Sequence, residues 1–182
     1  MSPIKANAIR IVGGRCRGSL VRFPAHAALR PTPDRVRETL FNWLGQDLTG
    51  AATLELYAGS GALSLESLSR GAQLAVAVDR DPELVRAIRD NAERLGLEGL
   101  ETHRSDAELF LRAEARRFDV VFLDPPFAGN RWPELLPACA ARLIEGGAIY
   151  AEAGHAIVAP PGLVLARSAK AGQVYYHLLR LA

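Results

Sequence analysis

The sequence Asp124-Pro125-Pro126-Phe127 directly follows an almost continuously apolar run at residues 118–123. Two consecutive prolines keep the backbone extended and prevent it from continuing as a helix. The Asp124 carboxylate and the neighbouring carbonyls then become hydrogen-bond acceptors at fixed positions, and Phe127 adds an aromatic face. This set suits a planar amino group on a ring, whose N–H bonds meet the oxygens while the ring stacks on the phenyl group.

A glycine-punctuated turn with the sequence Tyr-Ala-Gly-Ser-Gly occupies residues 57–61. Gly59 and Gly61 allow the backbone to come close to a ligand at the start of a helix. Asp79 follows 18 residues after Gly61, at the end of the next predicted strand, where a carboxylate can accept hydrogen bonds from both hydroxyls of a ribose. The pattern indicates a cofactor that contains a nucleoside. Ser64 stands where the dinucleotide pattern has its third glycine, which weakens NAD and leaves S-adenosylmethionine (SAM) open.

Asp106 comes two residues after a predicted strand at 100–104 and begins a predicted helix. Its carboxylate suits an adenine amino group or the N-cap of that helix, and the two interpretations stay equally open. The four histidines are dispersed without the spacing of metal ligands, so we expect no metal site. Ser60 has neither the G-x-S-x-G context nor a positioned histidine, which argues against a hydrolase.

Strand and helix patterns alternate from residue 52 onward, and this alternation predicts a doubly wound parallel sheet with helices on both faces. Ligands of such a sheet bind beyond the C-terminal ends of the strands, beside the first strand. Segments 163–167 and 174–181 have no helix between them and predict an antiparallel hairpin. The other predicted strands are 53–57, 74–79, 100–104, 118–123 and 147–152, and the helices are 61–70, one opening at Asp81-Pro82-Glu83, 107–115 and 132–143.

Residues 1–50 are predicted to form a small appendage ahead of a main domain at 51–182. Short β-prone runs at 9–12 and 20–23 flank a glycine-rich turn, and Thr32-Pro33 predicts the N-cap and first position of a helix. The appendage carries eight Lys or Arg against three Asp or Glu, a charge of +5, which leaves −3 for the rest of the chain. A basic segment on a mildly acidic body suggests a polyanionic partner.

The 182 residues are 49% apolar and 23% charged, which is typical of a soluble globular chain. No apolar stretch approaches the ~20 residues of a membrane span, and the N-terminus lacks the apolar core of a signal peptide. Cys16 and Cys139 are the only cysteines and lie far apart, which excludes a disulfide framework. We therefore expect a cytoplasmic protein without membrane contacts, and we take it to be a monomer.

The motifs together resemble the SAM-dependent amino-methyltransferases, through residues 55–61, Asp79, Asp106 and the Asp-Pro-Pro-Phe sequence. Residues 30–32 and 35–44 resemble more narrowly the RsmD family, whose members methylate a guanine N2 in 16S ribosomal RNA. Residues 11–15 and 65–72 extend the resemblance, which covers nearly the whole chain. It implies a Rossmann-like, seven-stranded class I methyltransferase sheet with a C-terminal antiparallel hairpin.

The resemblance and the charge pattern assign expected roles. The expected catalytic residues are Asp124, Pro125, Pro126 and Phe127. The residues expected to contact the cofactor are Glu55, Tyr57, Ala58, Gly59, Gly61, Asp79, Arg80, Asp106 and Ala107. The residues expected to contact the substrate are Arg10, Arg15, Arg17, Arg22, Arg30, Thr32 and Arg37. In this assignment Asp79 binds the ribose and Asp106 lies near the adenine. The Asp124 carboxylate and the Pro125 carbonyl accept hydrogen bonds from the N–H groups of the acceptor amine.

The expected partner is 16S ribosomal RNA or the small ribosomal subunit, with an assembled particle as the substrate. Three alternatives stay open: a DNA adenine-N6 methyltransferase using the same chemistry, an NAD(P)-dependent oxidoreductase, and a non-catalytic RNA-binding or assembly module. The first normally carries a target-recognition domain, for which 182 residues leave little room. The intact Asp124 argues against the third.

Overall fold

The computed structural model describes residues 6–25, 29–126 and 130–182. Its five helices within these residues are α1 Asp34–Leu44, α2 Ala62–Ser69, α3 Pro82–Leu95, α4 Ala107–Ala113 and α5 Trp132–Ala140. The strands are β1 Ala6–Arg10, β2 Leu20–Pro24, β3 Ala52–Leu56, β4 Leu74–Asp79, β5 Leu100–Arg104, β6 Phe118–Leu123, β7 Leu143–Ala153, β8 Leu163–Ala171 and β9 Val174–Leu181.

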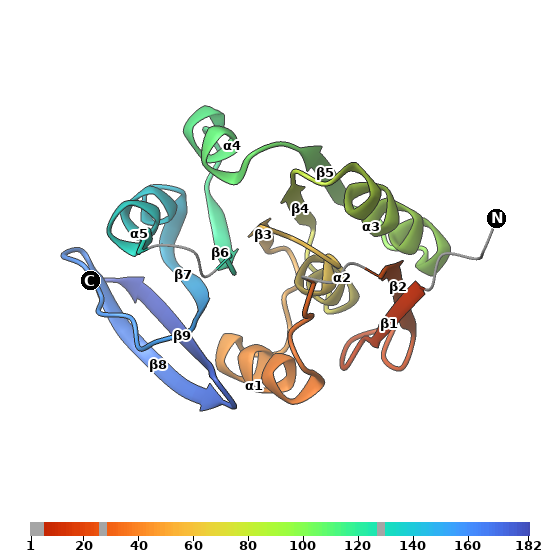
Figure 1. Ribbon diagram of the computed structural model, residues 1–182, viewed down its shortest axis with the longest axis horizontal. Helices are drawn as coiled ribbons and strands as arrows, with labels where there is room; N and C mark the ends of the chain where they lie inside the picture. The colour runs from red at the N-terminus through yellow and green to blue at the C-terminus, as the bar shows by residue number, and fades with distance from the viewer. Residues whose placement is uncertain (1–5, 26–28, 127–129) are drawn as a thin grey trace.

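A seven-stranded sheet in the order β5-β4-β3-β6-β7-β9-β8 forms the centre of the molecule (Figure 1). The first five strands of this order are parallel, and β9 runs antiparallel to both of its neighbours. The chain order reverses at β3, which has β4 on one side and β6 on the other. The predicted fold class is confirmed, and the switch point of the sheet lies at the C-terminal ends of β3 and β6.

Two apolar clusters cover the two faces of the sheet. The first joins α1, α2 and α3 to one face, with Leu40, Leu65 and Ile88 all at most 1% exposed. The second joins α4 and α5 to the other face through residues such as Leu111 and Leu136. Strand β6 is buried along nearly its whole length, as a central parallel strand requires.

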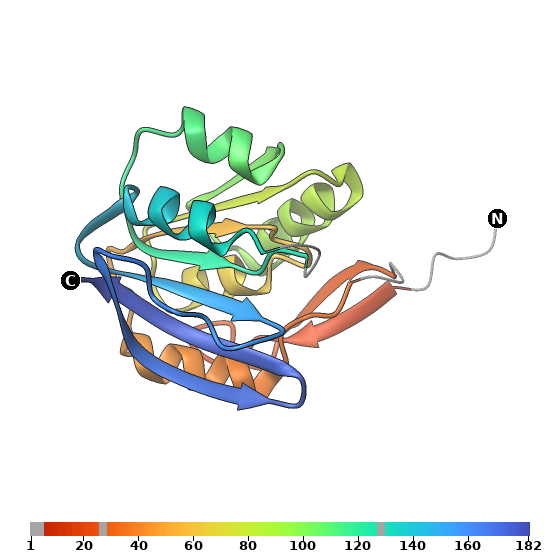
Figure 2. The same ribbon diagram turned by 60° about the vertical axis from the view of Figure 1, so that its left-hand side comes forward.

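The N-terminal hairpin pairs β1 with β2, with Ile9 opposite Val21, and it extends away from the sheet (Figure 2). Strand β1 ends at Arg10, earlier than the predicted run at 9–12, because the following loop folds back onto α2. Gly14 has a φ of +72°, and a Cβ there would lie 2.0 Å from the Ser69 carbonyl oxygen. Only glycine permits this close approach.

Helix α1 packs into the same core as the main domain, because Val36, Leu40 and Phe41 belong to the first apolar cluster. Ile11 and Val21 belong to that cluster as well. The predicted appendage at 1–50 therefore shares its core with the remainder of the chain. Among the described residues, no helix is both long enough and apolar enough to cross a lipid bilayer.

The start of α1 differs from the prediction. Pro33 is the N-cap, and no side chain caps the helix there. The Thr32 hydroxyl, predicted to be the cap, donates instead to Glu152 on β7. The cap predicted for α3 is confirmed, since the Asp81 side chain accepts from the backbone N–H of Glu83 at 2.8 Å.

Candidate functional site

The glycine turn between β3 and α2 is held in a narrow range of conformations. Tyr57, Gly59 and Gly61 all have positive φ, at 57°, 55° and 70°. A Cβ on Gly61 would lie 2.6 Å from the Ile88 side chain, so the turn has no room for a larger residue. The Gly59 N–H donates to the Asp79 carboxylate at 2.8 Å. The turn and the end of β4 are therefore tied together at the switch point of the sheet.

A pocket opens beside this turn, at the C-terminal ends of β3 and β6. It brings together seven residues that the sequence assigns to the site: Arg30, Thr32, Glu55, Tyr57, Ala58, Gly59 and Asp124. Leu29, Pro31 and Phe122 also line it. Asp79, Arg80, Asp106 and Ala107 do not line this pocket and lie along the ends of β4 and β5 next to it. We call the lined space the strand-end pocket.

Asp79 uses both carboxylate oxygens in local hydrogen bonds. One accepts from Gly59 and the other from the Asp81 N–H at 2.9 Å. Each carboxylate oxygen has a further lone pair, so the side chain retains acceptor capacity toward a ligand. The bonds hold the carboxylate at the edge of the glycine turn, where the sequence predicts a ribose contact.

Asp106 is the N-cap of α4, and this is one of the two interpretations that the sequence left open. Its carboxylate accepts from the N–H groups of Glu108 at 2.9 Å and Leu109 at 3.1 Å. These backbone bonds, the Leu109 bond foremost, lower the pKa of Asp106. Arg80 forms an ion pair with the same carboxylate at 3.4 Å, and Ala107 is the buried first residue of the helix.

Glu55 is buried below the glycine turn and faces the start of α2. Its carboxylate accepts from the Ser64 hydroxyl at 2.5 Å and from the Ser64 N–H at 2.9 Å. Burial raises the pKa of Glu55 to about 7, against the opposing effect of the Ser64 hydrogen bonds. Glu55 therefore stabilises the first turn of α2, and its oxygens are already engaged by the protein.

Asp124 follows the last residue of β6 and is half-buried in the strand-end pocket. Its side chain accepts no hydrogen bond from the described residues. Burial raises its pKa well above the ordinary value, and the charges of Glu152 and Glu55 raise it further. Pro125 is buried and Pro126 is exposed. Phe127, the fourth member of the predicted set, lies outside the described residues.

Glu152 belongs to this site, although the sequence analysis did not select it. It lies on β7, only 5% exposed, and accepts from the Thr32 hydroxyl at 2.6 Å and the Tyr150 hydroxyl at 2.8 Å. The usable signal was a carboxylate that directly follows the apolar run at 148–151, as Asp124 follows the apolar run of β6.

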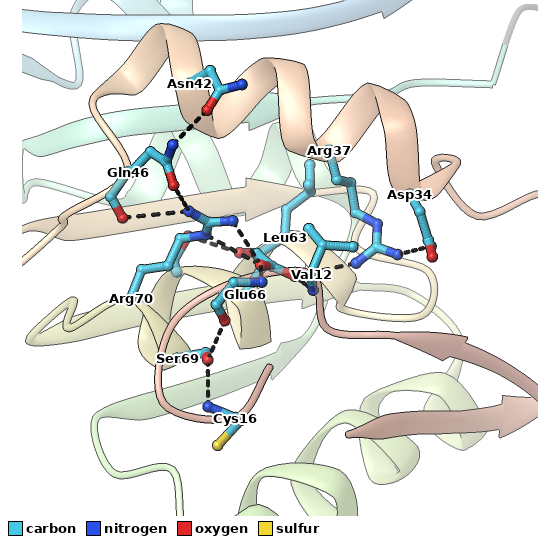
Figure 3. A network of polar contacts seen from close by, with 12 residues as sticks. Val12, Cys16, Asp34, Arg37, Asn42, Gln46, Leu63, Glu66, Ser69 and Arg70 are labelled. Atoms are coloured by element: carbon cyan, nitrogen blue, oxygen red, sulfur yellow. Dashed lines mark hydrogen bonds and ion pairs between the residues drawn. The ribbon is translucent and has the colours of Figure 1, made fainter. Parts of the chain in front are cut away.

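Arg37, which the sequence analysis assigns to substrate contacts, lies in the interior of the protein. Its side chain is 1% exposed and forms an ion pair with the fully buried Glu66 at 3.2 Å. The Glu66 carboxylate also accepts from the backbone N–H groups of Val12 and Gly13 and binds Arg70 (Figure 3). Arg37 thus has no surface to offer an external substrate, because a buried guanidinium needs its carboxylate partner.

The remaining predicted substrate contacts have different surroundings. Arg10, Arg17, Arg22 and Arg30 are exposed. Arg15 is exposed as well, but its guanidinium donates to the Gly96 carbonyl at 2.6 Å. Thr32 is buried and lines the strand-end pocket, so any ligand contact of its own lies inside the pocket.

No three His, Cys, Asp or Glu side chains come together in an arrangement that could hold a metal ion within residues 6–25, 29–126 and 130–182.

The chain is similar to several known proteins. The family model described as "Conserved hypothetical protein 95" matches residues 9–180. Ribosomal RNA small subunit methyltransferase D of Escherichia coli is 37% identical over 175 residues, which cover 93% of this chain and 88% of that protein. A putative rRNA methyltransferase of Bacillus subtilis is 35% identical over 158 residues, covering 84% and 86%. The solved structure of a putative methyltransferase from Escherichia coli aligns with a TM-score of 0.85 at 37% identity, covering 96% and 98%.

Proposed function

This chain belongs to the "Conserved hypothetical protein 95" family and is similar to ribosomal RNA small subunit methyltransferase D of Escherichia coli, and from this we propose that it is a SAM-dependent rRNA methyltransferase. The acceptor in this proposal is the exocyclic N2 amine of a guanine in 16S ribosomal RNA, within an assembled small-subunit particle. The observation that carries the proposal is Asp124: a half-buried carboxylate without a described hydrogen-bond donor, directly before a proline pair, in the strand-end pocket.

The residues around the pocket fit SAM by their chemistry. Gly59 and Gly61 bring the backbone close to the pocket, where a side chain would collide with Leu29 or Ile88. Asp79 has acceptor capacity for ribose hydroxyls at the edge of the same turn. Asp124 adds to the lining of the same pocket a carboxyl group that accepts no hydrogen bond from the described residues. In the proposal Arg80 and Asp106 flank the adenine.

When bound, SAM supplies a methyl carbon activated by its positively charged sulfur. The guanine amine is a weak nucleophile, because its lone pair is delocalised into the purine ring. In the proposal, the Asp124 carboxylate and the Pro125 carbonyl accept hydrogen bonds from its two N–H groups. These hydrogen bonds favour a pyramidal nitrogen with its lone pair facing the pocket. Fixed orientation of this kind can supply ~7–11 kcal/mol of the barrier. In the proposal the N–C bond would form as the bond between the methyl carbon and the sulfur breaks, with its electron pair left on the sulfur, and Asp124 would accept the one proton that the nitrogen loses.

The protein surface around the N-terminal hairpin supports a polyanionic substrate. Arg10, Arg17 and Arg22 are exposed on the hairpin and on the loop that follows β1. Guanidinium groups bind phosphate oxygens through paired donors, and such contacts orient an RNA without reading its sequence. The target base must leave its stack to enter a pocket, which costs least in a single-stranded or looped RNA.

Mass spectrometry of 16S ribosomal RNA from cells with and without the gene tests the proposal. We expect one N2-methylguanine to disappear with the gene and to return with the wild-type copy but not with Asp124→Ala. Methylation in vitro of purified small subunits and of naked 16S RNA then identifies the substrate. Methyl transfer to an adenine, or an unchanged methylation pattern, contradicts the guanine assignment.

A further inference from the structure

Asp124 and Glu152 lie level at the ends of two adjacent parallel strands. Strand β6 pairs with β7 so that Leu123 is opposite Ala151, and the next residue of each strand is one of these two acids. Neighbouring strands of a sheet are ~4.8 Å apart. The two carboxyl groups therefore face the same switch point, and the negative charge of one acts on the other.

The two carboxyl groups differ in their hydrogen bonds. Glu152 accepts from two hydroxyl groups, those of Thr32 and Tyr150, at 2.6 and 2.8 Å. Hydroxyl donors stabilise the ionised form of a carboxyl group. Asp124 has no such donor among the described residues. Glu152 is consequently the member of the pair that retains the negative charge, and Asp124 is the member that takes up a proton more readily.

Thr32 is itself fixed by the interior of the protein. Arg37 donates from Nε to the Thr32 carbonyl at 3.2 Å. Its other nitrogens bind Glu66 and Asp34, as Figure 3 shows. The hydrogen bond from Thr32 to Glu152 thus joins the segment 29–33, of which residues 29–32 line the strand-end pocket, to the end of β7. The two residues are 120 positions apart in the sequence.

We propose that Glu152 is a positioning residue for methyl transfer, which makes Asp124 a stronger base through its negative charge and holds the Thr32 segment against the pocket. This inference rests on the function proposed above. A stronger base accepts the amine proton more readily, and proton transfer is most efficient when the pKa of the acceptor lies near the working pH.

Other titratable groups flank the pair among the described residues, and one of them is the buried Tyr176 on β9, which lies opposite Glu152 in the register of β7 and β9. Glu55 on β3 adds a second, weaker negative influence on Asp124. Tyr150 on β7 is bonded to Glu152, and burial raises its pKa, so it remains a neutral donor. From the segment 29–33, Arg30 lines the same pocket and is exposed. Removing the charge of Glu152 is therefore expected to dominate the response of Asp124.

The test uses Glu152→Gln, which retains an oxygen acceptor for Thr32 and Tyr150 but removes the charge. The ionisation of Asp124 is followed in the ligand-free protein by NMR of 13C-labelled aspartate carboxyl groups, with the signal assigned from Asp124→Asn. We expect the titration midpoint of Asp124 to fall by about one pH unit, because a nearby like charge raises a pKa by that order. An unmoved midpoint overturns the proposal.

The second arm measures methyl transfer against pH. In Glu152→Gln, the acidic limb of the plot of kcat against pH should move to lower pH, because Asp124 is then ionised over a wider pH range. The plateau value of kcat should fall, because Asp124 is then a weaker base. Both changes should occur with an unaltered KM for the RNA. Loss of activity with the wild-type pH profile indicates structural damage alone and overturns the proposal.

Two further variants serve as controls. Asp119→Asn changes a carboxyl group at the N-terminal end of the same strand, β6, where Asp119 accepts from the Ala52 N–H at 2.8 Å. It should leave both the Asp124 midpoint and the pH profile unchanged. Thr32→Val removes the hydroxyl that binds Glu152 and should lower kcat, whereas Thr32→Ser should restore it.

The two proposals fail separately. A wild-type protein that does not methylate small-subunit RNA rejects the proposed function, whatever the NMR titration gives. A wild-type protein that methylates the RNA while Glu152→Gln retains its Asp124 midpoint and its pH profile rejects only the role of Glu152.

Discussion

The acidic side chains around the strand-end pocket carry the same functional group but differ in what already binds their oxygens. Glu55 is occupied by the start of α2, and Asp106 caps α4. Asp79 fixes the glycine turn and retains acceptor capacity. Asp124 has no described donor and carries a raised pKa. These differences separate structural acids from those that are available to a ligand.

Replacement of Asp124 by alanine should lower methyl transfer by about 100-fold or more, the minimum that general acid–base groups commonly contribute. The affinity for SAM should stay within several-fold of the wild type, because in our proposal the carboxylate faces the acceptor amine. Single-turnover assays with small subunits and calorimetry with SAM measure the two effects. Normal turnover of the variant would exclude the proposed mechanism.

Replacement of Asp79 by alanine should act on the cofactor instead. We expect SAM binding to weaken by about 1.5–3 kcal/mol, the range for hydrogen bonds to a charged group. Asp79→Asn retains one acceptor oxygen and should therefore lose less binding free energy for SAM. Calorimetry compares the two variants, and an affinity equal to the wild type in Asp79→Ala would remove this residue from the cofactor site.

At the scale of the elements, the N-terminal hairpin and the loop that follows β1 combine two properties. The loop is anchored on α2, where Arg15 N–H donates to the Ser69 carbonyl and Cys16 N–H to the Ser69 hydroxyl. The hairpin extends away from the sheet and carries exposed arginines (Figure 2). Because Arg10 and Arg17 lie at the anchored end of the hairpin, on and beside the loop that follows β1, this end is suited to holding RNA near the main domain without taking part in the chemistry.

Replacement of Arg10 and Arg17 together by alanine tests this role. Arg15 is left unchanged because its guanidinium binds the Gly96 carbonyl. We expect a higher KM for the particle and a salt dependence of binding that flattens by about 0.7 in log–log slope for each lost single-strand phosphate contact. The affinity for SAM should not change.

Arg112→Ala is a matched control for this pair, since Arg112 is an exposed arginine on α4, on the other face of the sheet. In plots of the logarithm of the binding constant against the logarithm of the salt concentration, wild type and the Arg112→Ala control should give parallel lines. The double variant should give a flatter line. Three parallel lines of equal affinity would reject the hairpin as an RNA contact.

At the scale of the whole molecule, Glu66 joins segments that are distant in the sequence. Its carboxylate binds Arg37 of α1, Arg70 after α2 and the backbone at Val12 and Gly13 (Figure 3). The Arg70 guanidinium also lies 4.4 Å from the centre of the Phe41 ring. The network therefore fixes the N-terminal loop and α1 on the main domain through one buried anion.

Glu66→Gln should lower the free energy of unfolding by about 3–5 kcal/mol, because two buried guanidiniums lose their compensating charge. Asp34→Asn removes the other, half-exposed partner of Arg37 and should cost no more than about 1 kcal/mol. Denaturant titrations of the two variants measure the difference. Equal losses would mean that Glu66 is not the centre of the network.

The features of the fold that depend on neighbouring residues could be predicted from the sequence. A proline pair after an apolar strand predicts where β6 ends, and Gly59, Gly61 and Asp79 predict the turn at the switch point. The alternation of strand and helix patterns predicted the sheet that the structure contains. Local backbone chemistry fixes these features, because proline and glycine restrict or release φ wherever they stand.

The contacts between side chains that are distant in the sequence became known from the folded structure alone. Thr32 was predicted as a helix cap and binds Glu152 instead, 120 residues away. Arg37 was predicted to face a substrate, since arginine is usually exposed, but Glu66 compensates its charge in the interior. Such pairings follow from the packing of α1 against the sheet and from the register of β6 and β7. No local pattern encodes them, because burial and partner are properties of the assembled fold.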